Sequence, residues 1–279
     1  MTVPVGGLRL SYVVPAWNEA DGITTTLDAL ANSASQLAAD GVIATAEFVV
    51  VDDGSTDGTP ELLAQRSVAD ARLTVVTHDR NRGLGAAIRS GLAAATGDVV
   101  VYTDADLPFD LAEVRTGLDT MQRTDADIVS LYRYSRSGEG ARRYVFSLVY
   151  NALVRWGLGL RVRDVNFAGK LLRRAVLDAV DLHSEGSFID AELLARAQRA
   201  GFRITQFGVN YFPRSRGVST LSSTPVVLNI LREFLRLRPA IRAAGPSLSG
   251  SAHTDGVGAG GHRRRVLDAY AQHPVATRA

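Results

Sequence analysis

The chain has 279 residues, of which 46% are hydrophobic and 22% are charged, and it contains no cysteine. This composition predicts a globular protein with one large core or two smaller ones. The lack of cysteine excludes disulfides, thiolate zinc sites and a cysteine nucleophile, so a metal site must use carboxylates or histidine. We find neither a secretory leader nor an apolar run of about 18 residues, and we expect a cytoplasmic protein without a membrane-spanning helix.

Charge is unevenly distributed along the chain, although the net charge is only +2. Residues 1–129 carry a net charge of −11, residues 130–240 carry +10, and the last 39 residues carry +3. An acidic half suits divalent cations and a basic half suits phosphate or an anionic bilayer, while solvated surface explains part of each imbalance. The near-neutral total, without a basic patch interleaved with aromatic residues, argues against nucleic-acid binding.

Strand and helix patterns alternate over the first 130 residues. Four apolar runs rich in β-branched residues predict buried strands, and the segments between them have helical patterns. The strands are predicted at residues 8–14, 47–51, 73–77 and 98–103, and the helices at residues 20–39, 59–66 and 84–95. This alternation predicts an α/β fold with a mostly parallel central sheet flanked by helices.

Segments that are unusually rich in polar residues stand directly after three of the predicted strands. Ligands of such sheets bind beyond the carboxyl ends of the strands, so we expect these residues to face one crevice and bind a nucleotide. They are Pro15, Ala16, Asn18 and Glu19 after the first strand, residues 52–59 after the second, and residues 104–106 after the fourth.

The turn at residues 52–59 has two compatible interpretations. Its glycines permit a tight turn, and Asp53 can accept a hydrogen bond from a nucleobase N–H. The same turn can cap the following helix, a role for which Ser55, Thr56 or Asp57 is suited.

Asp104 and Asp106 are separated by one residue at the end of a predicted strand. Both carboxylates can reach a divalent ion that bridges diphosphate oxygens, and oxygen ligands suit Mg²⁺ or Mn²⁺. Such an ion neutralises the charge on a departing diphosphate. The alternative interpretation is an aspartate-rich turn without a metal.

Together these segments resemble glycosyltransferase family 2. The matching segments are residues 13–19, 51–59, 81–87, 97–98 and 103–107. The resemblance implies a GT-A-type nucleotide-sugar-binding fold, inverting transfer and a UDP- or GDP-sugar donor. It places the following residues at the nucleotide sugar: Pro15, Ala16, Asn18, Glu19, Asp52, Asp53, Gly83, Asp104 and Ala105. It also makes Asp104 and Asp106 the metal ligands.

The second half begins with a predicted strand at residues 126–131, followed by a Gly/Ser/Arg loop at residues 135–140. A helical stretch follows at residues 143–160. A second one at residues 226–238 separates leucine and phenylalanine from arginine, which fits membrane contact, a core helix or a dimer interface.

The predicted domain organisation follows from these elements. We expect one glycosyltransferase domain at residues 1–242, made of a nucleotide-sugar-binding half (1–129) and an acceptor-binding half (130–242). Glycine, serine, histidine and alanine dominate residues 243–279, which predicts a mostly disordered tail.

The second half resembles the polyprenyl-phosphate sugar synthases, to which the dolichyl-phosphate mannosyltransferases belong. The matching residues are 132–134, Arg143 with Ser147, residues 163–164 with 169–174, and Arg214 with Gly217 and Ser219. The resemblance implies transfer of a single sugar, of the GDP-mannose or UDP-glucose type, to a polyprenyl phosphate or other lipid acceptor. It places Arg133, Arg143, Ser147 and Arg214 at the acceptor phosphate. Arg143 and Ser147 lie one helical turn apart, so both can bind the same phosphate. A surface salt bridge is an equally simple interpretation of Arg143.

Two carboxylates compete for the catalytic role on the acceptor side. A phosphate acceptor is already ionised near neutral pH, so Asp164 would orient the acceptor or an arginine. Asp190 would act as the base if the acceptor were a hydroxyl. Residues 164–170 depart from the commonest synthase pattern, in which a Gly-Phe pair precedes the basic residue. A hydroxyl acceptor and a non-catalytic nucleotide-sugar binder therefore remain alternatives.

The membrane is the last expected partner. The sequence lacks the Gln-x-x-Arg-Trp motif of processive polysaccharide synthases, which favours single-sugar transfer. We expect a peripheral protein on the inner face of the cell membrane, attached through residues 226–238 or through a separate membrane-anchor protein. Arginines near anionic headgroups contribute about 1 kcal/mol each.

Overall fold

The computed structural model describes residues 7–134, 141–212 and 224–243, and of residues 141–148 and 224–225 it describes the backbone alone. The loop predicted at residues 135–140 lies outside the described residues. So does the predicted tail, apart from Ala243, with which the last helix ends. The predicted domain boundaries therefore stay a prediction.

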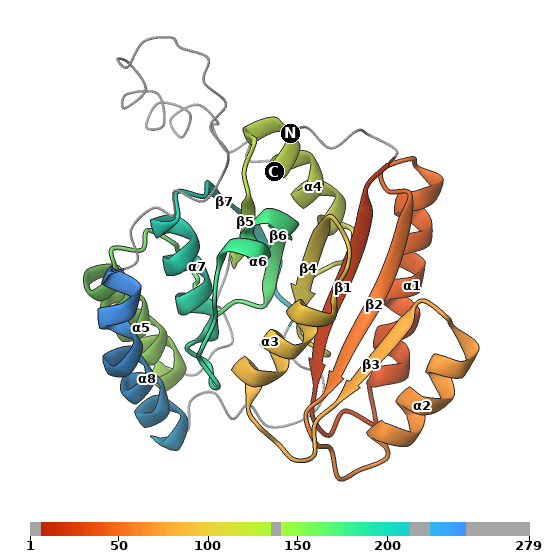
Figure 1. Ribbon diagram of the computed structural model, residues 1–279, viewed down its shortest axis with the longest axis horizontal. Helices are drawn as coiled ribbons and strands as arrows, with labels where there is room; N and C mark the ends of the chain where they lie inside the picture. The colour runs from red at the N-terminus through yellow and green to blue at the C-terminus, as the bar shows by residue number, and fades with distance from the viewer. Residues whose placement is uncertain (1–6, 135–140, 213–223, 244–279) are drawn as a thin grey trace, which may run out of the picture. The chain divides into compact units, whose positions relative to one another are not determined.

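A seven-stranded sheet runs through the centre of the described chain (Figure 1). Its order is β3-β2-β1-β4-β6-β5-β7, and every neighbouring pair is parallel except the two pairs that include β6. The strands are β1 (Arg9–Ala16), β2 (Thr45–Asp52), β3 (Leu73–Thr77), β4 (Val99–Thr103), β5 (Ile128–Arg133), β6 (Gly169–Arg173) and β7 (Ile204–Val209). The mostly parallel α/β fold class is confirmed.

Helices cover both faces of this sheet. They are α1 (Ile23–Ala39), α2 (Thr59–Ala69), α3 (Leu84–Ala94), α4 (Glu113–Thr124), α5 (Ala141–Leu158), α6 (Arg174–Ala179), α7 (Ile189–Arg199) and α8 (Thr224–Ala243). Buried residues of α1, α2 and α4 share one hydrophobic core, whereas those of α3 and α5 to α8 share another.

Strand side chains alternate between these two cores. On β1, Tyr12 and Val14 belong to the α1 side and Val13 belongs to the α3 side. On β4, Val101 faces the first core and Tyr102 the second. This alternation has the two-residue period of a strand, and burial on both faces explains why the strands appear in the sequence as continuous apolar runs.

The antiparallel strand β6 was not predicted. Its position in the sheet determines which residues of the second half lie next to residues of the first half. It lies between β4 and β5, and its register pairs Lys170 with Tyr102 and Gly169 with Thr103. Residues 164–170 therefore lie beside the end of β4, where the Asp104 turn begins. The helices α4, α6 and α7 and the strand β7 were also not predicted.

The two long helices predicted in the second half are present. The helix α5 (Ala141–Leu158) is shifted slightly towards the N-terminus from the predicted residues 143–160, and α8 (Thr224–Ala243) extends beyond both ends of the predicted residues 226–238. In the part of the chain that the structure describes, no helix has the length and apolar character needed to span a bilayer.

Candidate active site

The carboxyl ends of β1, β2 and β4 meet at one edge of the sheet. Ala16 pairs with Asp52, and Val13 pairs with Tyr102, close to the ends of their strands. Chain order reverses at β1, because β2 and β3 lie on one side of it and β4 on the other. Ligands of open α/β sheets bind at such a reversal, and the residues predicted at the nucleotide sugar all lie in or near the segments that end there.

Side-chain hydrogen bonds join the loop after β1 to the loop after β2. The Asn18 N–H donates to Ser55 Oγ at 2.9 Å, and the Thr56 N–H donates to Asn18 Oδ1 at 2.8 Å. The Glu19 N–H donates to Thr59 Oγ1 at 2.9 Å. Asn18 has a φ of 54°, a left-handed conformation that asparagine tolerates better than most residues. The two loops thus form one rigid wall of the edge.

Part of this wall also caps α2. The N-cap position is Gly58, and Asp57, one of the three predicted capping residues, accepts the Thr59 N–H at 3.0 Å. Asp52 is buried and its Oδ1 accepts the Ser55 N–H at 3.0 Å. Because the N-cap is Gly58, without a side-chain cap hydrogen bond, none of the three predicted residues is the N-cap itself, although Asp57, directly before it, accepts the first N–H of α2. A ligand role for the turn stays a prediction.

Asp53 is buried and connects the loop after β2 to the loop between β3 and α3. Its Oδ1 lies 2.6 Å from His78 Nδ1 and accepts the Arg82 N–H at 2.9 Å, while its Oδ2 accepts the Gly83 N–H at 2.9 Å. A carboxylate has about four lone-pair positions, and three are occupied here. Asp53 thus fixes the loop that carries Gly83, and its contact with a nucleobase stays a prediction that depends on the remaining position.

His78 was missed by sequence reasoning. It directly follows β3, as Asp52 ends β2 and Asp104 follows β4, and that position was the signal that could have found it. Besides Asp53, it contacts Ser90 of α3, with 2.9 Å between Nε2 and Oγ. His78 therefore links the loop after β2 to α3.

Asp104 and Asp106 form the turn after β4, with both side chains partly exposed. The Tyr102 hydroxyl lies 3.5 Å from Asp104 Oδ1, and burial raises the pKa of that hydroxyl well above its usual value. The carbonyl of Ala105 accepts the hydroxyl of Thr26 from α1, which fixes the middle of the turn. Two adjacent carboxylates that remain partly open to solvent have the chemistry that a hard divalent cation requires.

Arg133 and Asp164 form a buried, two-pronged ion pair. Arg133 Nε and Nη2 donate to the two Asp164 oxygens at 2.7 and 3.0 Å. The guanidinium also lies 5.7 Å from the centre of the Phe167 ring and 5.2 Å from that of Tyr211. Of the two predicted roles for Asp164, orienting an arginine is the one that this geometry displays.

Lys170, the only lysine of the chain, is fully buried beside Asp190. Its Nζ lies 2.6 Å from Asp190 Oδ1 and donates to the Phe167 carbonyl at 2.8 Å. Burial raises the pKa of the Asp190 carboxyl, an effect that Lys170 opposes and the nearby charge of Asp164 reinforces. Asp190 thus lies at the site edge, but its charge is already balanced within the protein.

The remaining predicted acceptor residues cannot be placed to the same depth. Arg143 and Ser147 lie one turn apart in α5, where the backbone alone is described, and Arg214 lies outside the described residues. Their roles stay predictions.

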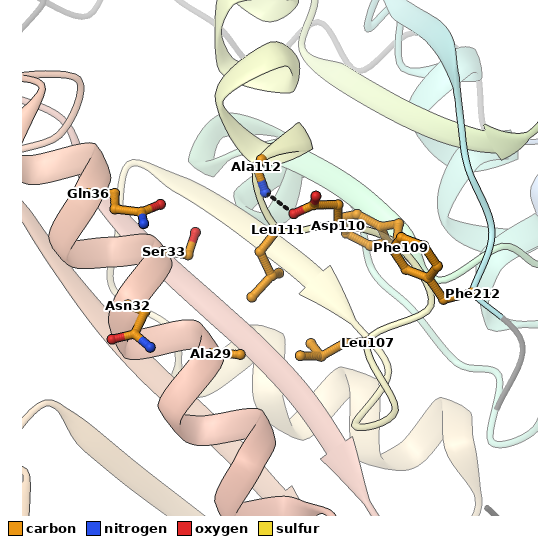
Figure 2. Close-up of a pocket in the computed structure, with 10 residues that line it drawn as sticks. All are labelled: Ala29, Asn32, Ser33, Gln36, Leu107, Phe109, Asp110, Leu111, Ala112 and Phe212. Atoms are coloured by element: carbon orange, nitrogen blue, oxygen red, sulfur yellow. Dashed lines mark hydrogen bonds between the residues drawn. The ribbon is translucent and has the colours of Figure 1, made fainter. Parts of the chain in front are cut away.

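A pocket of about 430 Å³ lies between α1 and residues 107–112 (Figure 2). Figure 2 shows Asn32 of α1 on one side of it and Phe109 and Phe212 on the other. None of the predicted site residues lines it, although Leu107 directly follows Asp106. The pocket therefore lies next to the turn at residues 104–106 and is separate from the predicted donor residues.

The helices α5 and α8 lie side by side (Figure 1), and Phe234 of α8 packs against Gly157 of α5. Both helices expose apolar side chains. Trp156 is 82% exposed and Leu235 is 66% exposed. The α5–α8 surface comprises Val149, Trp156, Leu228, Leu231 and Leu235. Most large apolar side chains that the described chain exposes elsewhere stand singly, so this concentration on two neighbouring helices distinguishes the surface.

Comparison with known proteins agrees with the sequence resemblance. The family model "Glycosyl transferase family 2" matches residues 11–180. The chain is 34% identical over 214 residues to glycosyltransferase AglD from Haloferax volcanii, covering 75% of this chain and 34% of that protein. It therefore spans about a third of the length of that relative.

A second relative matches over most of both chains. The polyprenol monophosphomannose synthase of Mycolicibacterium smegmatis is 29% identical over 229 residues, which cover 78% of this chain and 83% of that protein.

A solved structure supports the fold. Glucosyl-3-phosphoglycerate synthase from Mycobacterium tuberculosis, in complex with Mn²⁺, UDP-glucose and phosphoglyceric acid, superposes with a TM-score of 0.62 at 24% identity. The match covers 84% of this chain and 80% of that one. The family model, the relatives and the superposition agree: this chain belongs to glycosyltransferase family 2 and has a GT-A-type fold.

Proposed function

We propose that this chain transfers a single sugar from a nucleoside diphosphate sugar to a polyprenyl phosphate at a membrane surface, with inversion at the anomeric carbon. The position of β6 is the observation that carries the proposal. Because one strand separates β4 from β5, the Asp104 turn and Arg133 end about two strand spacings, or roughly 10 Å, apart. A carboxylate-rich donor side and an arginine-bearing acceptor side therefore share one edge.

On the donor side, the wall formed by the loops after β1 and β2 would hold the nucleoside. Asp104 and Asp106 would hold Mg²⁺ or Mn²⁺, with diphosphate oxygens and water completing the coordination shell. When bound, the ion would neutralise the charge that develops on the departing nucleoside diphosphate. Partial exposure of both carboxylates, directly after a buried strand, fits this role.

On the acceptor side, Arg133 would bind the acceptor phosphate. A guanidinium offers five N–H donors in a planar fork that suits phosphate oxygens, and in Arg133 two of its nitrogens bind Asp164. Asp164 holds the arginine in place, and the sequence resemblance adds Arg143, Ser147 and Arg214. A phosphate oxygen is ionised near neutral pH and would form the bond to the anomeric carbon, as the bond to the diphosphate breaks, without giving up a proton.

The Lys170–Asp190 pair favours this acceptor over a hydroxyl. A hydroxyl acceptor needs a base that is accessible and within hydrogen-bonding reach of its proton. Asp190 is buried and already bound to a buried ammonium group. The positions of Asp190 and Lys170 therefore suit a structural ion pair better than a general base.

Membrane contact would occur through the α5–α8 surface, on the inner face of the cell membrane. Apolar side chains on an amphipathic helix insert into the headgroup region, and neighbouring arginines are attracted to anionic lipids. Arg232 and Arg236 lie on the exposed part of α8, next to Leu231 and Leu235. The name of the Mycolicibacterium relative, polyprenol monophosphomannose synthase, supports the same acceptor class.

The test is a transfer assay with purified protein, Mg²⁺ or Mn²⁺, labelled UDP-glucose or GDP-mannose, and vesicles that contain polyprenyl phosphate. Label extracted into organic solvent as an acid-labile lipid is the expected result, and it also identifies the donor. Transfer to a soluble alcohol, with none to the lipid phosphate, would contradict the proposal and make the hydroxyl acceptor the better one. Nucleotide binding without transfer to any acceptor would indicate a non-catalytic binder.

A further inference from the structure

Two buried carboxylates, those of Glu233 and Glu192, hold a short stretch before α7, residues 183–186, which we call the 183–186 segment. Glu233 of α8 accepts the Glu185 N–H at 2.8 Å and the Gly186 N–H at 3.0 Å through Oε1, and it accepts the Ser184 hydroxyl at 2.9 Å through Oε2. Glu233 is only 5% exposed. A carboxylate buried beside three donors makes charge-assisted hydrogen bonds, which are stronger than neutral ones.

The second carboxylate belongs to α7 and holds the other half of the segment. Glu192 Oε2 accepts the N–H groups of His183 and Ser184 at 3.0 and 2.7 Å, and its Oε1 accepts Arg196 Nε at 2.8 Å. Four successive N–H groups therefore point towards two carboxylates. The carbonyl oxygens of Ser184, Glu185 and Gly186 lie close to Gly83 or Gly85 at the start of α3.

The carbonyl of Glu185 caps the first turn of α3. It accepts the Gly85 N–H at 2.8 Å and the Ala86 N–H at 3.2 Å. The approach is so close that a Cβ atom on Gly83 or Gly85 would lie 2.6 Å from a carbonyl oxygen of the segment. Gly83 also has a φ of 95°, which an L side chain rarely adopts. Glycine is thus required at both positions by the segment that Glu233 holds.

Gly83 joins this packing to the donor side. Its N–H donates to Asp53, which also accepts the Arg82 N–H and contacts His78. A chain of direct contacts therefore runs from Glu233 through the 183–186 segment and Gly83 to Asp53. Each link is a charge-assisted hydrogen bond or a backbone contact without space for a side-chain atom.

We propose that Glu233 is a positioning residue for the nucleotide-binding loop at residues 79–83. Its carboxylate acts from α8 through the 183–186 segment. The inference rests on the proposed function, in which the loop after β2, with Asp53, holds the nucleoside, and on the sequence resemblance that places Gly83 at the nucleotide sugar. Without the carboxylate, two backbone N–H groups and one hydroxyl lose their acceptor, and the segment no longer fixes the start of α3. The loop at residues 79–83 then samples positions in which the nucleotide contacts are incomplete, so affinity for the nucleotide falls.

The test measures the dissociation constants of UDP and GDP, with Mn²⁺ present, by calorimetry on the full chain. Glu233→Leu removes the acceptor at similar volume, and we expect the dissociation constant of the nucleotide that wild type binds to rise about tenfold or more, as the loss of hydrogen bonds to a charged group predicts. Glu233→Gln keeps the carbonyl oxygen for the two N–H groups and can donate to Ser184, so it should stay within about threefold of wild type. Glu113→Leu, the same exchange on α4, is the matched control and should bind like wild type.

A second pair of readouts separates positioning from general destabilisation. Amide hydrogen exchange at Gly85 and Ala86 should accelerate in Glu233→Leu, and Ser184→Ala, which removes only the hydroxyl contact, should weaken nucleotide binding by about two- to fivefold. If Glu233→Leu does not fold, the other two variants test the proposal. Weaker nucleotide binding by Ser184→Ala, with near-wild-type binding by Glu233→Gln, would support the positioning role, and wild-type binding by Ser184→Ala would overturn it.

The outcomes distinguish the two proposals. Folded Glu233→Leu with a lower melting temperature and an unchanged nucleotide dissociation constant would overturn the positioning role and leave the proposed function intact. Wild-type protein that binds neither UDP nor GDP would overturn the proposed function, and the inference with it.

Discussion

The donor side and the acceptor side of the site edge are held together by different forces. On the donor side, the loops after β1 and β2 are joined by hydrogen bonds between backbone N–H groups and short polar side chains such as Asn18 and Ser55. On the acceptor side, the buried pairs Arg133–Asp164 and Lys170–Asp190 provide the order. A typical hydrogen bond contributes about 1 kcal/mol, whereas a broken buried ion pair costs about 3–5 kcal/mol. A single substitution on the donor side should therefore lower the free energy of unfolding less than a substitution that breaks an ion pair on the acceptor side.

The largest effect is expected from Lys170→Met, because it leaves Asp190 buried without its cation. We expect the free energy of unfolding at pH 7 to fall by about 3–5 kcal/mol. Without Lys170, the pKa of Asp190 in the folded state rises further above its unfolded value. The loss should therefore be smallest at low pH, where Asp190 is protonated in both states, and should grow as the pH rises.

Denaturant unfolding of wild type and Lys170→Met between pH 4 and 8 measures this effect, with the double variant Lys170→Met/Asp190→Leu as its control. The double variant should recover much of the stability, since an apolar pair of similar volume can replace a buried ion pair. A loss in the single variant that does not change with pH would show that Asp190 is not the group left uncompensated.

Asp104→Asn tests the donor side, where the expected effect is on turnover and not on stability. Removing a carboxylate from the proposed metal site should lower kcat by a factor of about 10² or more. Asp119→Asn makes the same exchange at an exposed position on α4 and should leave turnover unchanged. Steady-state kinetics with metal in excess measures both, and near-wild-type rates for Asp104→Asn would remove this residue from the metal site.

Trp156→Ser/Leu235→Ser tests the α5–α8 surface. Partial burial of two large apolar side chains in the interface should contribute enough that partition onto vesicles falls about tenfold or more in the double variant. Val68→Ser is the matched control, because Val68 is 89% exposed on α2. Sedimentation with vesicles rich in anionic lipid gives the partition coefficients. If wild type itself does not bind vesicles, a separate membrane-anchor protein becomes the better explanation.

Asp164→Asn tests whether the acceptor side depends on a fixed arginine. The variant keeps the size of the side chain but loses the charge that holds Arg133, so the KM for the acceptor should rise about tenfold while nucleotide affinity stays unchanged. Kinetics at varied polyprenyl phosphate and calorimetry with nucleotide separate the two quantities. Equal losses in both would place Asp164 on the donor side as well.

The smallest effect concerns the surface pair Arg9–Asp98, at the amino-terminal ends of the parallel strands β1 and β4. The Arg9 guanidinium, which donates to Asp98 at 2.8 Å, lowers the pKa of that carboxyl, and burial opposes the effect. A lowered folded-state pKa stabilises the protein above the unfolded pKa and loses that contribution as the pH falls through the folded pKa. Asp98→Asn should therefore destabilise slightly at pH 7, and the difference should shrink below about pH 4, in the same unfolding experiment.

The elements of the first half could be predicted because their signals are local. Continuous apolar runs predict strands buried on both faces, and the polar residues that follow them are brought together by the parallel sheet whatever the details of packing. Asp52, Asp53 and Asp104 were predicted as site residues in this way, and the structure places them in or directly after the ends of β2 and β4. The role of Asp53 in fixing the loop that carries Gly83 was not predicted, because its partners His78 and Gly83 lie 25 and 30 residues further along the chain.

The sequence by itself thus determined the fold class, the family and the donor-side segments, since each depends on residues adjacent in the chain. Tertiary structure decided the acceptor side: the antiparallel strand β6 has no periodic signal of its own, and its pairing with β4 and β5 depends on contacts made across the sheet. Only that pairing buries Lys170 against Asp190 and brings the Arg133–Asp164 pair to the edge that also carries Asp104. Burial, which turns an ordinary charge into one that needs a partner, is a property of the folded chain alone.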